Sequence, residues 1–145
     1  MNHILIALDF SEYSPEVEKV GYSIAQKINA TVTLVGIINK MIDYMPADTG
    51  QVFENQWEAR KDIAWKALQE VQAKHPDVST ELVSFIGDPK EDIIDLSIKQ
   101  HTTFIVIGTH GRTGMQHVLT GSTAEYIIRH AVVPIIVVPL RKKRH

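Results

Sequence analysis

The sequence contains no cysteine, which excludes disulfides, thiolate catalysis and cysteine-ligated metal sites. Charge of one sign is also lacking: fifteen basic and seventeen acidic residues give a formal net charge of -2, so no overall basic field exists to gather nucleic acid. No apolar run approaches the length of a membrane-spanning helix. The opening residues, MNHILIALDF, lack the features of a secretory signal. We therefore expect a cytoplasmic protein with no nucleic-acid or membrane partner.

Length and composition indicate one globular domain. The chain has 145 residues, of which 44% are hydrophobic and 22% are charged, values close to the average for folded soluble proteins. We expect a single domain over residues 1–140. The last residues, 141–145, read RKKRH and are predicted to form a solvated basic tail.

Short apolar runs alternate with longer segments of helical periodicity. Such runs are typical of strands that are covered on both faces of a parallel sheet. The predicted strands cover residues 3–8, 31–38, 78–86, 103–108 and 134–139. The predicted helices cover residues 14–29, 51–75, 88–100 and a segment that begins near Ser122. Residues 39–50 have no consistent period and are predicted to form a loop that could cover a ligand.

The helical segments carry apolar stripes and capping residues. The stripes are Val17, Val20, Gly21, Ile24, Ala25 and Ile28 in the first helix, and Phe53, Trp57, Ala64, Ala67, Leu68 and Val71 in the second. The candidate caps are Ser14 before Pro15, Asp88 before Pro89 with Glu91 placed to reach back, and Ser122 with Glu125. One face of each helix is therefore expected to pack on the sheet.

These elements predict an α/β fold with an open, doubly wound, parallel five-stranded sheet of Rossmann-like type. The simplest strand order is 3-2-1-4-5, with helices on both faces. In that order the first and fourth strands are neighbours, and a crevice opens beyond their carboxyl ends. Asp9 ends the first strand and Gly108 ends the fourth, so we expect the two to converge there.

The segment after the fourth strand is rich in glycine. Gly108, Gly111 and Gly121 could let backbone amides turn toward an anion, and Gly121 precedes a helix start that favours negative charge. Ser122, Thr123 and Arg112 could add hydrogen bonds to a phosphate. The alternative is that these glycines only turn the chain into the next helix. The segment does not match the P-loop motif or the dinucleotide motif G-x-G-x-x-G.

Three stretches together resemble a single-domain universal stress protein of the ATP-binding branch. They are ILIALDFSEYS, Gly87-Asp88-Pro89 and GTHGRTGMQHVLTGSTAEYIIRHAVVPIIVVP, and the resemblance runs from residue 3 to 139. The resemblance implies contacts to the nucleotide from Ala7, Leu8, Asp9, Ile37, Ile38, Ile107, Gly108, His110, Gly111, Arg112, Gly121, Ser122 and Thr123. The implied ligand is ATP, with AMP or ADP as alternatives, and with Mg²⁺ if a triphosphate binds. The MQH at 115–117 replaces the basic residues of many members and predicts weaker triphosphate binding.

Alternatives stay open for several of these residues. Asp9 could accept hydrogen bonds from ribose hydroxyls, or it could only order the turn DFSEYS. His110 and His117 show no ligand spacing, so we expect neither a metal site nor a catalytic residue. With no positioned base beyond Asp9 and no acidic pair for Mg²⁺, efficient catalysis is not expected.

The last predicted strand suggests a protein partner. Residues 134–138 are strongly apolar and are predicted to end the sheet, where a second chain could pair, unless a loop or the tail covers the edge. The resemblance also implies a homodimer through this strand. The function expected is nucleotide-responsive regulation during stress through an unidentified protein partner. A slow ATP hydrolase and a nucleotide-free interaction module are the alternatives.

Overall fold

The computed structural model describes residues 1–10, 14–38, 53–87, 89–109 and 122–139, with the side chains of residues 53–57 outside the description. Strands and helices alternate along the chain in the order that the sequence predicts. The elements are β1 (His3–Leu8), α1 (Ser14–Ile28), β2 (Thr31–Ile38), α2 (Phe53–Lys74), β3 (Thr80–Ile86), α3 (Lys90–Lys99), β4 (Phe104–Gly108), α4 (Ser122–His130) and β5 (Ile135–Val138).

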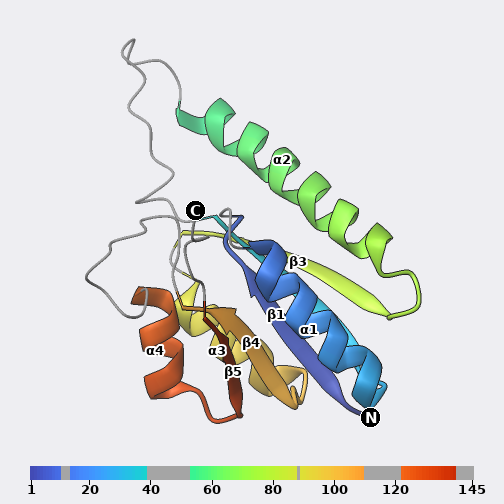
Figure 1. Ribbon diagram of the computed structural model, residues 1–145. Helices are drawn as coiled ribbons and strands as arrows, with labels where there is room; N and C mark the ends of the chain where they lie inside the picture. The colour runs from blue at the N-terminus through green and yellow to red at the C-terminus, as the bar shows by residue number, and fades with distance from the viewer. Residues whose placement is uncertain (11–13, 39–52, 88, 110–121, 140–145) are drawn as a thin grey trace, which may run out of the picture.

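The five strands form one parallel sheet in the order β3-β2-β1-β4-β5, which confirms the predicted fold class and strand order (Figure 1). All four pairings are in parallel register, for example Ile4 with Val32 and Ile4 with Phe104. The carboxyl ends of the strands therefore lie along one edge of the sheet. We call this edge the carboxyl edge and the opposite one the amino edge.

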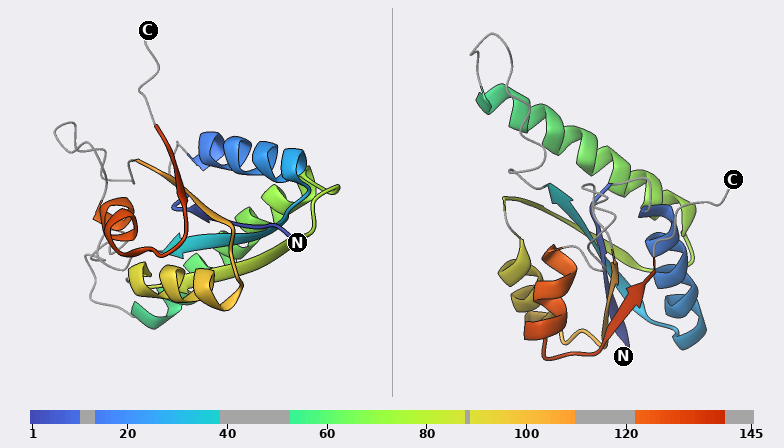
Figure 2. Two further views of the ribbon diagram at one scale, coloured as in Figure 1. Left: turned by 90° about the horizontal axis from the view of Figure 1, so that it is seen from below. Right: turned by 60° about the vertical axis from the view of Figure 1, so that its left-hand side comes forward.

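Helices cover both faces of the sheet (Figure 2). The helices α1 and α2 lie on one face, and α3 and α4 lie on the other. Side chains of β1 alternate between the two resulting cores: Ile4 and Ile6 pack toward α1 and α2, and Leu5 packs toward α3 and α4. All three are fully buried. Each face of β1 is apolar because each face is covered, which explains its continuous hydrophobic run. Among the described helices, none combines the length and apolarity needed to cross a bilayer.

The edge strands and helix starts refine the predictions. The strand β3 is half-buried along most of its length, because it lies at the edge of the sheet. Pro89 does not occupy the first helical position. It is the N-cap of α3, with φ -86° and ψ 9° and no side-chain cap, and its carbonyl accepts the first helical hydrogen bond from Ile93. Asp88 lies outside the described residues.

The two other predicted caps make different contacts. The side chain of Glu125 pairs with Arg129 at 2.8 Å, one turn further along α4. The hydroxyl of Ser14 donates to Asp9. The helical stripe of α2 is confirmed where side chains are described, because Ala64 and Leu68 are buried. Phe53 and Trp57 fall among the side chains that are not described.

Candidate functional site

The carboxyl edge brings together the ends of β1 and β4. Ile6 pairs with Val106, so Leu8 and Gly108 each lie two residues further along neighbouring strands. Asp9 follows directly and is partly exposed. The predicted convergence of the first and fourth strands is thus present in the backbone. An edge of this kind, where the strand order reverses, is where ligands bind in open α/β sheets.

Asp9 makes a hydrogen bond within its own turn. The hydroxyl of Ser14, the first residue of α1, donates to Oδ1 of Asp9 at 3.2 Å. This bond joins the end of β1 to the start of α1 and is the contact that a turn-ordering role requires. A contact from Asp9 to a nucleoside stays a prediction.

Phe10 turns the chain sharply after Asp9. Its φ of 61° is in the left-handed region, which costs a non-glycine residue free energy. Its ring packs over Gly36 of β2, where a Cβ would lie 2.7 Å from Cζ of Phe10 and 3.1 Å from Cδ1 of Leu68. Only glycine leaves room for this ring. The direction of the chain beyond Asp9 therefore depends on a glycine in the core, a relationship that the sequence pattern did not reveal.

The apolar members of the predicted site are core residues. The exposed fractions are 7% for Ala7, 2% for Leu8, 9% for Ile37, 4% for Ile38 and 4% for Ile107. Their side chains fill the two cores, so a ligand at the carboxyl edge would meet them mainly through backbone groups. One such group is already used, because the carbonyl of Ile38 accepts from the amide of Gly87 at 3.0 Å.

The polar members lie at the end of β4 and the start of α4. Gly108 is half-exposed, and the amide of the following residue, Thr109, donates to the carbonyl of Val138 at 3.1 Å. Ser122 is exposed and Thr123 is half-buried in the first turn of α4. The remaining predicted contacts, His110, Gly111, Arg112 and Gly121, lie outside the described residues.

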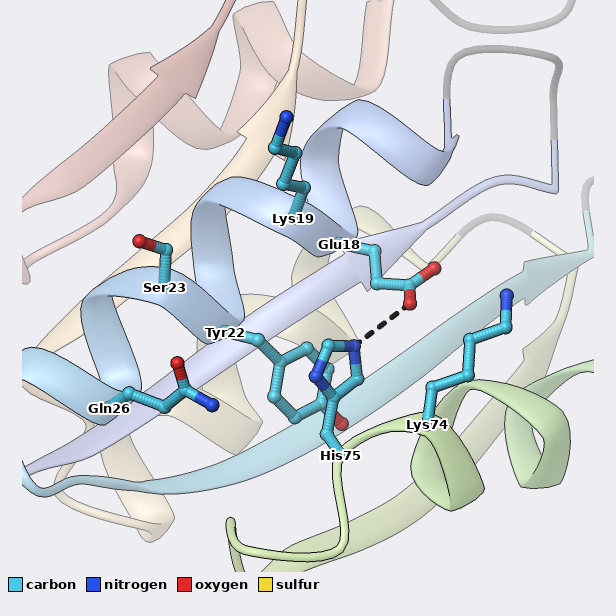
Figure 3. A pocket seen from close by; sticks show the side chains of 7 residues that line it. All are labelled: Glu18, Lys19, Tyr22, Ser23, Gln26, Lys74 and His75. Carbon is cyan, nitrogen blue, oxygen red and sulfur yellow. Dashed lines mark hydrogen bonds and ion pairs between the residues drawn. The ribbon is translucent and has the colours of Figure 1, made fainter.

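A second polar site lies between α1 and the end of α2 (Figure 3). It is a groove of about 370 Å³, lined by Glu18, Lys19, Tyr22, Ser23, Gln26, Lys74 and His75. At its centre the rings of Tyr22 and His75 are stacked, and Nε2 of His75 lies 3.0 Å from Oε1 of Glu18. The side chains of Lys19 and Ser23 point away from this pair (Figure 3). The polar groups at the centre of the groove therefore contact one another, and the lining side chains do not converge on a space for a ligand.

Sequence reasoning missed this groove, although α1 carries a signal for it. Polar residues recur every fourth position on α1, and each bonds outside the helix. These pairs are Ser14 with Asp9, Glu18 with His75, Tyr22 with Thr80 and Gln26 with Asp77. The spacing puts them on one face beside the apolar stripe. Glu18 can be buried, at 9% exposed, because His75, the residue after α2, bonds to its carboxylate.

Solved structures with this fold include proteins that hold nucleotides. The universal stress protein UspA from Lactobacillus plantarum matches 94% of this chain and 97% of its own with a TM-score of 0.80 and 26% identity. A universal stress protein in complex with cAMP and one from Arabidopsis thaliana with AMP bound match with TM-scores of 0.67 and 0.66. Both are 15% identical to this chain, so they show the shared fold alone.

Sequence comparison reaches the family level. The family model described as the universal stress protein family matches residues 1–139. A universal stress protein of Methanocaldococcus jannaschii is 31% identical over 97% of this chain and 83% of its own. The resemblance read from the motifs is thereby confirmed, and the chain belongs to the universal stress protein family.

Proposed function

We propose that this chain binds an adenine nucleotide at the carboxyl edge, between β1 and β4, and acts as a nucleotide-responsive regulator in the cytoplasm. ATP is the first candidate, with AMP or ADP as alternatives and Mg²⁺ as companion of a triphosphate. The observation that carries the proposal is that β1, which Asp9 follows, lies beside β4 at the point where the strand order reverses. Nucleotides in two neighbours of the same fold, AMP in one and cAMP in the other, support the choice of ligand.

The chemistry of the edge suits a nucleoside phosphate. Asp9, partly exposed beyond β1, would accept hydrogen bonds from ribose hydroxyls. The amides and hydroxyls of Ser122 and Thr123 open α4, where the helix dipole favours anionic oxygens. Gly108, Gly111, Arg112 and Gly121 would complete the phosphate contacts, as the motif predicts. The buried ends of β1 and β2 would supply backbone contacts to the base.

We further propose that two copies pair through β5. This strand bonds to β4 on one side and is the last in the sheet order, so its other edge is open to a second strand among the described elements. If two copies paired through this edge about a two-fold axis, their two sheets would form one continuous sheet. The carboxyl end of β5 lies next to Thr109, so pairing would also bear on the candidate nucleotide site.

Calorimetric titration of the full chain with ATP, ADP, AMP and cAMP, with and without Mg²⁺, tests the nucleotide proposal. We expect binding at submillimolar nucleotide and a loss of about tenfold or more in affinity for Asp9→Ala, because ribose hydroxyls would lose a charged acceptor. Asp95→Ala, which removes an exposed carboxylate from α3, should bind as the parent chain does. A folded chain that gives no heat with any of these nucleotides would refute the proposal.

A further inference from the structure

A hydrogen-bonded network crosses the amino edge of the sheet, opposite the candidate nucleotide site. His3 begins β1, and its ring lies between the hydroxyl of Thr33 on β2 and that of Thr102, just before β4. Thr33 continues to Gln100, which follows α3, and Gln100 continues to Glu81 on β3. The network therefore joins β1, β2 and β3 to the end of α3 and the turn before β4. Its most buried members are Thr33 and Thr102, which are 0% and 6% exposed.

The direction of these hydrogen bonds is set by Glu81. A carboxylate only accepts, so Gln100 turns its amide nitrogen toward Oε2 of Glu81, at 3.0 Å. The amide oxygen of Gln100 then accepts from the hydroxyl of Thr33, at 2.8 Å. Because Thr33 donates its one proton to Gln100, its oxygen accepts from Nε2 of His3, at 2.8 Å. The neutral ring of His3 therefore carries its hydrogen on Nε2.

The other ring nitrogen of His3 is then an acceptor. Nδ1 lies 2.9 Å from the hydroxyl of Thr102, which must donate to it. Protonation of the ring would put a hydrogen on Nδ1 and turn this acceptor into a donor. The Thr102 hydroxyl would have to rotate and find a new acceptor for its own proton, in a place where it is 6% exposed. The network thus accommodates the neutral ring and conflicts with the charged one.

The electrostatic surroundings act in the same direction. Burial lowers the pKa of His3 from its ordinary value of 6.5, and the charge of Glu81 opposes this with a smaller effect. Of the described neighbours, Glu81 on β3 is the charged one, while Thr33, Gln100 and Thr102 are neutral. His101 is exposed, next to the network in sequence.

We propose that His3 is an acid-sensitive latch, whose protonation opens the amino edge at the start of β1, the end of α3 and the turn before β4. The latch would protect two backbone hydrogen bonds at the amino edge: the amide of Thr103 donates to the carbonyl of His3 at 2.7 Å, and the amide of Thr102 donates to the carbonyl of Ser97 at 2.9 Å. The carboxyl edge has no part in the network. The chain would therefore loosen at one edge on acidification and stay closed at the other.

The direction of the pH dependence follows from the difference in the pKa of His3 between the closed and the open state. In the closed state the ring is neutral, and in the open state it is a free imidazole that takes up a proton near pH 6.5. Closure is therefore unaffected by pH above 6.5 and weakens as pH falls through 6.5 toward the lowered pKa of the closed state. Within that window the opening constant rises up to about tenfold for each pH unit.

Nuclear magnetic resonance of the full chain tests the latch in two ways. The ring nitrogens of His3 should show hydrogen on Nε2 at neutral pH and titrate below the ordinary histidine range. Protection factors, corrected for intrinsic exchange, should fall for the amides of Thr102 and Thr103 as pH drops below 6.5. The amide of Thr109 at the carboxyl edge should keep its protection over the same range. A ring with hydrogen on Nδ1, or equal loss of protection at both edges, would refute the proposal.

Variants distinguish the proposed effect of His3 protonation from a general loss of stability in acid. His3→Gln cannot take up the proton and should remove the pH dependence of protection at Thr102 and Thr103. Glu81→Gln can still accept from Gln100 through its amide oxygen, but it removes the charge that favours the cation of His3, so the midpoint should move to lower pH. His101→Asn, an exposed position with φ 51° that asparagine tolerates, is the matched control and should behave as the parent chain. An unchanged or higher midpoint in Glu81→Gln would contradict the latch even if His3→Gln fails to fold.

Discussion

The imidazole of His75 lies flat against the ring of Tyr22, with centroids 3.8 Å apart and planes inclined by 4° (Figure 3). The same imidazole bonds to Glu18 at 3.0 Å, so one side chain from the residue after α2 holds two residues of α1. Stacking of this kind contributes about 0.5–1.5 kcal/mol beyond the area that it buries. The three side chains therefore fasten the end of the longest helix to its neighbour.

His75→Ala should lower the free energy of unfolding by about 1–3 kcal/mol, because the stack is lost and the nearly buried Glu18 loses its partner. Urea unfolding at neutral pH measures this change. Lys74→Gln, an exposed change at the preceding residue, should stay within about 0.5 kcal/mol of the parent chain. If both variants are equally stable, the contact between α1 and α2 does not hold the helices together.

Alkaline pH should destabilise the chain through Tyr22. Burial raises the pKa of Tyr22 above its ordinary value of 10.0, the charge of Glu18 adds to this, and the hydrogen bond with Thr80 opposes it. The folded chain keeps the phenolic proton at a pH where the unfolded chain loses it. Stability should therefore decrease as pH rises from about 10 toward the raised pKa.

Urea unfolding across the alkaline range measures this slope. Tyr22→Phe should flatten it, because phenylalanine does not titrate, and should be less stable at neutral pH through loss of the Thr80 bond. Tyr126→Phe on α4 is the comparison variant and should keep the slope of the parent chain. A slope that survives in Tyr22→Phe would assign the alkaline effect to another group.

Gly36→Ala should destabilise the fold by about 1–3 kcal/mol through overpacking. The new Cβ would lie 2.7 Å from Phe10 and 3.1 Å from Leu68, so the Phe10 ring must move. Phe10 follows Asp9, so under the proposed function the change should also weaken nucleotide binding. Thermal unfolding and calorimetry measure the two effects.

Two further variants test whether the effect of Gly36→Ala is steric. Phe10→Leu in the Gly36→Ala background should recover part of the stability, because the shorter side chain makes room for the methyl group. Ser84→Ala, directly across from Gly36 on β3, should have little effect. Equal stability of Gly36→Ala and the parent chain would show that the packing beneath Asp9 is loose.

Val137→Pro should disrupt the proposed dimer and leave the fold intact. The amide of Ile105 donates to the carbonyl of Pro134, and the amide of Thr109 donates to the carbonyl of Val138. The backbone amides and carbonyls of the even-numbered residues of β5 therefore point toward β4, and those of Val137 point away from the sheet. Proline at 137 would remove an outward donor only, whereas Ile136→Pro would remove a bond of the ladder. Analytical ultracentrifugation should find Val137→Pro monomeric and folded and Ile136→Pro destabilised. A dimeric Val137→Pro would place the interface elsewhere.

Much of the architecture was predictable because its signals are local. The continuous apolar run of β1 and the stripe of Val17, Gly21 and Ala25 on α1 are periodicities of neighbouring residues, and they indicate element type directly. The strand order was predicted only as the simplest doubly wound arrangement, and the structure confirms it. Capping was less predictable: Pro89 took the N-cap of α3, because a residue without an amide hydrogen fits either position at a helix start.

Contacts between polar side chains from distant parts of the chain could not be predicted in this way. The sequence by itself determined the alternation of strands and helices, with Asp9 and Gly108 at the ends of the first and fourth strands, and the structure made these strands neighbours. Only the tertiary structure decided that Glu18 meets His75, 57 residues away, and that the ring of His3 meets Thr102, 99 residues away. A contact between distant residues depends on strand register and helix packing over the whole domain, whereas periodicity is set by the backbone geometry of a single element.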